Sequence, residues 1–255
     1  MEFKTYDPEE DDYLPSHYEG LLKKPEDVGK YREAVEEALN DAEEVLGMSS
    51  DVEIVFGLAD SEKVDERWGM ETGLNFHVHG FTYGSWFDDV DRDFIFLYAD
   101  DSKKGWEAAL KNLTVHERAH VDFYDHHSDE VLRERLRGSM YDNVLFEGHS
   151  TNAAEEVDGV KGYGRDPDHR QLGVLDPDFE KLCQELEKTR EESNLLDRGG
   201  ELSEEEGYNV AYEVFNWVLE NKGLDVTELP GLSEERTREL VDEAIEVLYV
   251  NLDLD

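Results

Sequence analysis

One segment of the sequence has the residue types and spacing of a metal-dependent hydrolytic site. Residues 116–120 read His-Glu-Arg-Ala-His, an HExxH pentapeptide. Positions four apart on a helix lie one above the other, so the imidazoles of His116 and His120 can point at one ion. Glu117 lies one step around the helix and can act as general base toward a water molecule on that ion. The pattern indicates a metal site with hydrolytic chemistry.

The residues before the motif place it on the inner face of a helix. Trp106, Ala109 and Leu113 precede His116 and His120 at helical spacing, so both imidazoles are expected to point inward. A buried histidine pair beside a buried glutamate is costly unless a cation compensates for it. The alternative is a pair of ordinary, hydrogen-bonded histidines on a half-buried helix.

A zinc site of this kind needs a third protein ligand, and two residues compete for the role. His126 lies where a metzincin-type HExxHxxGxxH motif has its third histidine, but Phe123 replaces the glycine that turns the chain there. Phe123 continues the helix and is expected to carry His126 away from the ion. Glu147 is favoured, because it is a carboxylate in an otherwise apolar helical stripe. Gly148 beside it is expected to let the two helices approach closely.

The elements that must position these residues follow from hydrophobic periodicity. A long helix is predicted around the HExxH motif, then a second helical region from Ser128 that is interrupted at Gly138 and restarted by Ser139. Residues 158–178, rich in Gly, Asp and Pro, are predicted to form a loop or lid. The remaining predicted helices are Pro25–Leu46, Phe179–Leu195, Glu204–Asn221 and Glu234–Leu252, and the predicted strands are Val52–Ala59, Asn75–Gly80 and Phe94–Ala99.

This order predicts a single α+β domain over residues 1–255, with a small, mostly antiparallel sheet followed by the HExxH helix and a helical C-terminal part. Residues 1–24 are expected to be a loose N-terminal segment. Residues 25–125 would hold the first helix, the sheet and the HExxH helix, and residues 126–255 the helical part. The sequence does not indicate an oligomeric state.

The net charge of the chain is informative about the salt environment and the partners of the protein, and less about its chemistry. The 255 residues include 66 Asp and Glu against 25 Lys and Arg, a formal net charge of −41. Such a charge disfavours nucleic acid or an anionic membrane as a partner and fits a halophilic cytoplasm, where salt screens the repulsion. We expect a soluble cytoplasmic protein, because neither a secretory signal nor an apolar run of about 18 residues is visible. Cys183 is the only cysteine, which excludes an intrachain disulfide.

Two motifs carry a resemblance to known proteins. HERAH at 116–120 followed by FEGHS at 146–150 resembles the gluzincin arrangement, with HExxH on one helix and a glutamate in an E-G-x-A context on the next. More narrowly, the layout resembles an uncharacterised family of predicted zinc-dependent proteases. That family has a β-rich segment before the HExxH helix and a tyrosine-containing segment after it, here Gly207–Tyr212. The resemblance covers roughly residues 25–252.

The resemblance implies a zinc-dependent protease acting on a peptide or protein. Zn²⁺ would be held by His116, His120 and Glu147, with Glu117 as the general base. A non-catalytic, zinc-stabilised binding or regulatory protein is the alternative, as is a metzincin-like site with His126 as third ligand.

The sequence departs from the family pattern at two positions. Ser150 replaces a small alanine, and Thr151 stands where thermolysin-like enzymes have an aspartate that orients a ligand histidine. Glu155 or a backbone carbonyl would then have to fill that role.

Other residues are open candidates for supporting roles. A donor to the transition-state oxyanion could come from Tyr208, Tyr212 or His149. His77 and His79 share one face of a predicted strand, where they could bind metal or contact a peptide, although two half-exposed histidines of a hairpin are the more common case.

Overall fold

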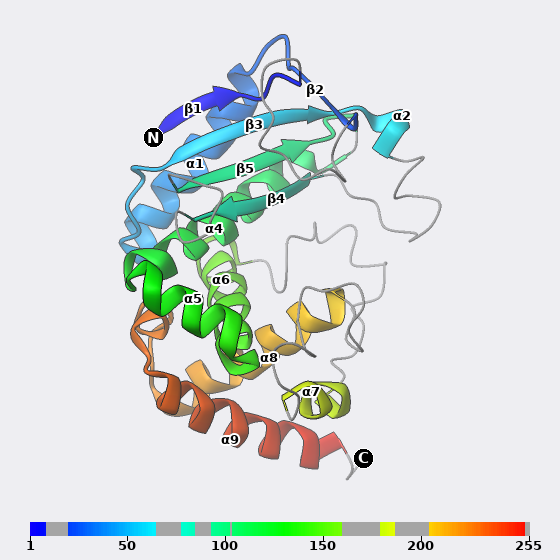
Figure 1. The fold of residues 1–255 in the computed structure, drawn as a ribbon. Coiled ribbons are helices and arrows are strands. Elements are labelled where there is room, and N and C mark those ends of the chain that lie inside the picture. Colours follow the sequence, from blue (N-terminus) through cyan, green and yellow to red (C-terminus); the bar gives the residue numbers. More distant parts are fainter. Residues whose placement is uncertain are drawn as a thin grey trace.

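A computed structural model describes residues 1–8, 20–64, 78–84, 93–102, 104–159, 179–186 and 204–252. Figure 1 shows a twisted sheet with α1 and α4 along one face and a group of helices beyond α4. The strands are β1 Glu2–Thr5, β2 Leu22–Lys23, β3 Glu53–Ala59, β4 Val78–Tyr83 and β5 Phe94–Ala99. The helices are α1 Gly29–Leu46, α2 Ser61–Val64, α4 Trp106–Asp125, α5 Asp129–Gly138, α6 Met140–Asp158, α7 Phe179–Leu186, α8 Glu204–Lys222, the 3-10 helix η4 Val226–Gly231 and α9 Glu234–Leu252. The α+β class is confirmed.

The sheet is mixed, so the expectation of mostly antiparallel pairing was wrong. Its order is β1-β3-β5-β4, with β2 also paired to β3. The β1–β3 and β3–β5 pairs are parallel, whereas β2–β3 and β4–β5 are antiparallel. Helix α1 lies between β1 and β3 in the chain and provides the crossover that a parallel pair needs. The antiparallel strand β4 lies at the end of this order, beside β5.

The N-terminal residues also differ from the expectation of a loose segment. Residues 2–5 form β1 against β3, and residues 22–23 form β2 on the same strand. Tyr6, directly after β1, is buried. Strands of four and two residues are too short to show a reliable alternation of apolar and polar side chains, so the sequence did not reveal them.

Helices α1 and α4 cover one face of the sheet. Their apolar side chains pack with alternate residues of β3 and β5, and this sheet-side core contains Tyr31, Val35, Leu39, Ile54, Phe56, Ile95, Leu97, Leu110 and Leu113. The other face of the same strands carries Val55, Phe96 and Tyr98, which pack with Tyr6 and Leu22. All six residues of β5 are buried, which explains why it reads as one continuous apolar run.

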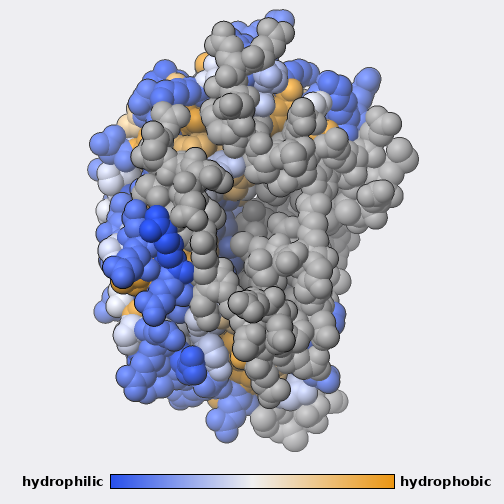
Figure 2. Space-filling model, in the orientation of Figure 1, coloured by the Kyte–Doolittle hydropathy of each residue, from blue (hydrophilic) through white to orange (hydrophobic). Residues whose placement is uncertain are grey.

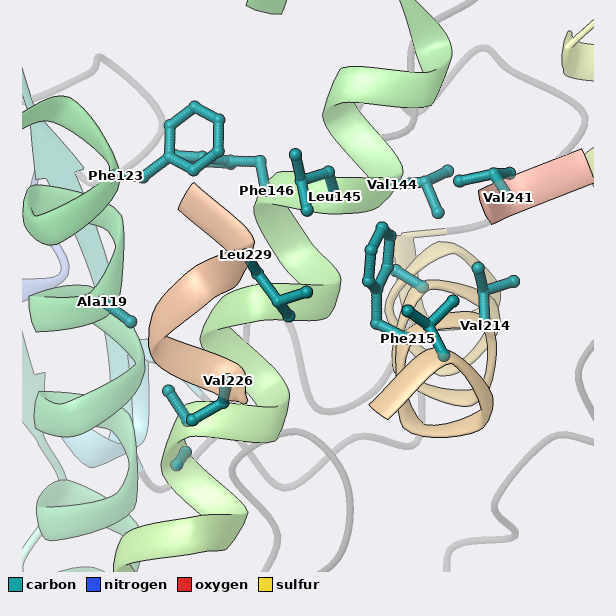
Figure 3. Close-up of a cluster of buried hydrophobic side chains, with 14 of the residues drawn as sticks. Ala119, Phe123, Val144, Leu145, Phe146, Val214, Phe215, Val226, Leu229 and Val241 are labelled. Atoms are coloured by element: carbon teal, nitrogen blue, oxygen red, sulfur yellow. The ribbon is translucent and has the colours of Figure 1, made fainter. Parts of the chain in front are cut away.

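The second core lies among the C-terminal helices, where α6 packs against α4 on one side and α8 on the other. Figure 3 shows this helix-side core, with Ala119 and Phe123 from α4, Val144, Leu145 and Phe146 from α6, Val214 and Phe215 from α8, Val226 and Leu229 from η4, and Val241 from α9. Cys183 is partly buried and packs against this core. Helix α4 therefore contributes to both cores.

The break before α6 lies where the sequence predicts it. Helix α5 ends at Gly138, and the Ser139 hydroxyl caps α6 by accepting from the backbone N–H of Asp142. The guanidinium of Arg135 pairs with the buried Asp142 carboxylate, with an Nε–Oδ1 distance of 2.8 Å. These contacts set the direction in which α6 leaves the corner.

Other predictions fall partly outside the described residues. These are residues 75–77 of the strand predicted over Asn75–Gly80, residues 160–178 of the predicted loop, and residues 187–195 of the helix predicted over Phe179–Leu195. Within the described part of the chain, no helix combines the length and apolar character needed to cross a membrane. On the side shown in Figure 2, the described surface is mostly hydrophilic.

Gly148 permits a close helix contact, but its partner is α8 and not α4. A Cβ at this position would lie 2.5 Å from Phe215 Cδ2 and 2.7 Å from the carbonyl oxygen of Ala211. We expect Gly148→Ala to lower the free energy of unfolding by about 1–3 kcal/mol, because backbone and a buried ring must move. Gly231→Ala is the matched control, since nothing lies within 4 Å of its added Cβ. Equal stability of the two variants in chemical denaturation would contradict the packing described here.

Candidate metal centre

The HExxH motif occupies the middle of α4, between the two cores. His116, Glu117 and His120 have exposed fractions of 1%, 3% and 6%. Such burial of three ionisable side chains on one helix is uncommon, because each charged form is disfavoured away from water. Both imidazoles therefore lie inside the fold, as the helical pattern predicts.

Helix α6 brings a carboxylate to the two imidazoles. The Nε2 atoms of His116 and His120 each lie 3.5 Å from Oε2 of Glu147, which is itself buried. One ligand atom from each residue can be chosen so that all lie within 4.8 Å of one another. Four-coordinate zinc with bonds of about 2.1 Å has ligand atoms about 3.4 Å apart. The spacing and the N,N,O donor set therefore fit a zinc ion.

The competing ligand, His126, lies outside this cluster. It follows the last residue of α4, and its Nδ1 donates a hydrogen bond to the carbonyl oxygen of Asp122, 2.7 Å away. Its side chain is 43% exposed. The helix continues through Phe123, so His126 emerges at the helix end and not at the buried pair.

Phe146 supports the cluster in a way that the sequence reading missed. Its ring stacks on the imidazole of His120 with a centroid separation of 3.8 Å and an interplanar angle of 15°. The His116 and His120 rings are 4.6 Å apart and nearly perpendicular, at 85°. Phe146 directly precedes Glu147, so the same turn of α6 supplies a candidate ligand and the ring that stacks on His120. The position of Phe146 directly before Glu147 was the sequence signal from which this contact could have been predicted.

Burial sets the protonation of the imidazoles. It lowers the pKa of His116 to about 4, against an opposing effect of Glu117, and it lowers the pKa of His120 well below its usual value. Both rings are therefore neutral near pH 7, which is the form that binds a metal.

Burial acts in the opposite direction on Glu117. It raises the pKa of this carboxyl to about 7, although His116 and a hydrogen bond from Thr82 both act to lower it. A carboxylate with a pKa near the working pH can both accept and return a proton. The hydroxyl of Thr82 on β4 lies 2.8 Å from Oε2 of Glu117. The sequence held no signal for this contact, because it did not reveal the strand order.

Glu155, proposed to orient a ligand histidine, is bonded to the candidate oxyanion donor Tyr212, and Thr151 bonds the backbone of its own helix. The Tyr212 hydroxyl donates to the carboxylate of Glu155, and the Thr151 hydroxyl donates to the carbonyl oxygen of Glu147. Within the described residues, Nδ1 of His120 has no hydrogen-bond partner. Glu155 is thus not seen orienting a ligand imidazole.

The other candidates from the sequence are only partly visible. The imidazole of His149 is fully buried, and neither of its nitrogens has a hydrogen-bond partner in the described part of the chain. Burial, with smaller effects of His126, His116 and Arg118, lowers the pKa of His149 to about 3. His77 and the side chains of His79 and Tyr208 lie outside the described residues.

The fold and the cluster define an α+β protein with a buried His-His-Glu candidate metal centre on two packed helices. The chain belongs to the family described as “Predicted Zn-dependent protease (DUF2268)”, whose sequence model matches residues 80–237. That match runs from β4 to the first turn of α9 and includes both motifs. No curated protein and no solved structure matches the chain.

Metal content separates the two possible third ligands. We expect Glu147→Gln to lose stoichiometric zinc, because the removed charge lies 3.5 Å from both imidazoles. The affinity should fall by more than the ~10–100-fold that loss of an outer partner costs. His126→Gln should bind as the wild type does. The measurement is elemental analysis with competition titration, and the reverse order of the two variants would favour the metzincin-like site.

His149 offers a second test of the site. Replacing it by methionine removes a buried polar group without hydrogen bonds and keeps a similar volume. Such an unsatisfied group costs about 1–3 kcal/mol, so the free energy of unfolding at pH 7 should stay unchanged or rise.

Chemical denaturation of His149→Met at pH 7 measures this. A loss above about 2 kcal/mol would show that His149 has a polar role in the fold. Unchanged stability with a large loss of turnover would instead support His149 as the transition-state donor.

Proposed function

We propose that this protein is a zinc-dependent peptidase with Glu117 as its general base. The observation that carries the proposal is the convergence of His116, His120 and Glu147 beside the buried Glu117 carboxyl. Two imidazoles and one carboxylate are a donor set typical of catalytic zinc, because three protein ligands leave a position for water or substrate. Membership of a family of predicted zinc-dependent proteases supports the same reaction.

The protein's own residues would supply binding and proton transfer. The Nε2 atoms of His116 and His120 and the carboxylate of Glu147 would hold the ion. Zinc at this position would polarise the scissile carbonyl and acidify the attacking water. Glu117 would accept the proton from that water and deliver it to the leaving amine, a role suited to its raised pKa.

The substrate we propose is a peptide or protein, and the setting a salt-rich cytoplasm. A net charge of −41 disfavours polyanionic partners and makes the chain repel itself in dilute buffer. Salt at molar concentration shortens the screening distance to about 3 Å and relieves that repulsion. Assays of this protein should therefore be run at high salt. Inactivity there can be attributed to the site and not to unfolding by charge repulsion.

A zinc-stabilised protein without catalysis is the second candidate. One observation favours it. The second ring N–H of a ligand histidine usually donates a hydrogen bond to a fixed partner, and Nδ1 of His120 has no such partner among the described residues. Failure of the zinc-loaded protein to cleave a peptide library at high salt, with a large fall in melting temperature on chelation, would favour this candidate.

Glu117→Gln tests the mechanism directly. The amide keeps the shape of the side chain but cannot take up the proton, so kcat should fall about 10²–10⁴-fold. Zinc content should remain stoichiometric, since Glu117 is not one of the clustered ligands. The assay is peptide cleavage in molar salt with parallel elemental analysis. Retained turnover in a zinc-loaded Glu117→Gln protein would exclude Glu117 as the base.

A further inference from the structure

The carboxylate of Glu117 is held from across the fold by strand β4. The Thr82 hydroxyl lies 2.8 Å from Oε2 of Glu117 and 3.0 Å from its backbone carbonyl oxygen. A hydroxyl carries one proton, and both acceptors that the described residues offer to it belong to Glu117. Thr82 is therefore bonded to Glu117 whichever oxygen it donates to.

The strand passes close enough to α4 to make this contact because position 80 is glycine. A Cβ there would lie 3.2 Å from Cγ of Glu117, 3.0 Å from the carbonyl oxygen of Phe96 and 2.8 Å from Cδ2 of Leu97. Side chains alternate between the two faces of a strand, so positions 80 and 82 lie on the same face of β4. Gly80 thus lies against the stem of the Glu117 side chain, while Thr82 bonds its carboxylate.

We propose that Thr82 is a positioning residue for the general base, an inference that rests on the proposed function. A glutamate side chain has several rotatable bonds, and one hydrogen bond to a rigid strand reduces the orientations of its carboxylate. With Oε2 engaged by Thr82, Oε1 is the oxygen that takes the proton from water and returns it to the leaving amine. Thr82 itself touches neither substrate nor metal in this role.

Three variants test the role of the hydroxyl. Thr82→Val keeps the shape and removes the hydroxyl, so kcat should fall about 10–100-fold while KM and zinc content stay within about threefold. Thr82→Ser restores the hydroxyl and should bring kcat within about threefold of the wild type. Thr237→Val is the matched control, because Thr237 is buried in α9 and its hydroxyl bonds only the carbonyl oxygen of Ser233 among the described contacts.

A thermal unfolding cycle provides a readout independent of turnover. Thr82→Val should lower the melting temperature by at least about 2 °C in the wild-type background, since a buried carboxylate loses a donor. In a Glu117→Met background the same change should cost clearly less, because the acceptor carboxylate is already gone. Equal shifts in both backgrounds would overturn the inference.

The outcomes separate this inference from the proposed function. If the wild type cleaves peptide and Glu117→Gln does not, but Thr82→Val keeps full kcat, the positioning role is wrong and the peptidase stands. A loss that appears only in KM or zinc content also overturns it. If the wild type cleaves nothing, the proposed function fails and the catalytic role of Thr82 fails with it. The unfolding cycle then decides only whether Thr82 holds Glu117.

Discussion

The burial of ionisable groups on α4 is the constraint on which the rest of the structure depends. A charged group taken out of water costs several kcal/mol unless it is neutralised or bonded. The two imidazoles meet this constraint by staying neutral, and Glu117 by a raised pKa and a hydroxyl donor from β4. Glu147 adds a carboxylate within 3.5 Å of both rings. The two imidazoles and this carboxylate could thus hold a cation between them.

Helix α4 can hold these groups away from water because it packs into both cores. Leu110 and Leu113 face the sheet, while Ala119 and Phe123 pack among the C-terminal helices. The position of Glu147 is fixed from both sides of α6. Phe146 packs toward α4, and Gly148 brings α6 almost into contact with the backbone of α8. A carboxylate on such a helix has little freedom to leave the imidazoles.

The sequence predicted what depends on local periodicity and missed what depends on pairing between distant segments. The motif helix, the break at Gly138 and Ser139, and Glu234–Leu252 were read correctly because 3.6-residue periodicity and capping residues are local. The strand order was not accessible, and the contact between Thr82 and Glu117, 35 residues apart, depends on it. The Tyr212–Glu155 bond, which spans 57 residues, depends on how α8 packs against α6, and the sequence did not predict that packing either.

The corner between α5 and α6 limits where residues can be inserted into or deleted from this chain. The Arg135–Asp142 pair and the Ser139 cap fix the start of α6, and Glu147 follows at a set number of residues. One residue inserted between Asp142 and Glu147 would rotate the carboxylate by about 100° and shift it by about 1.5 Å. The number of residues between this corner and Glu147 is therefore fixed by the structure. Relatives of this protein should differ in length outside this segment.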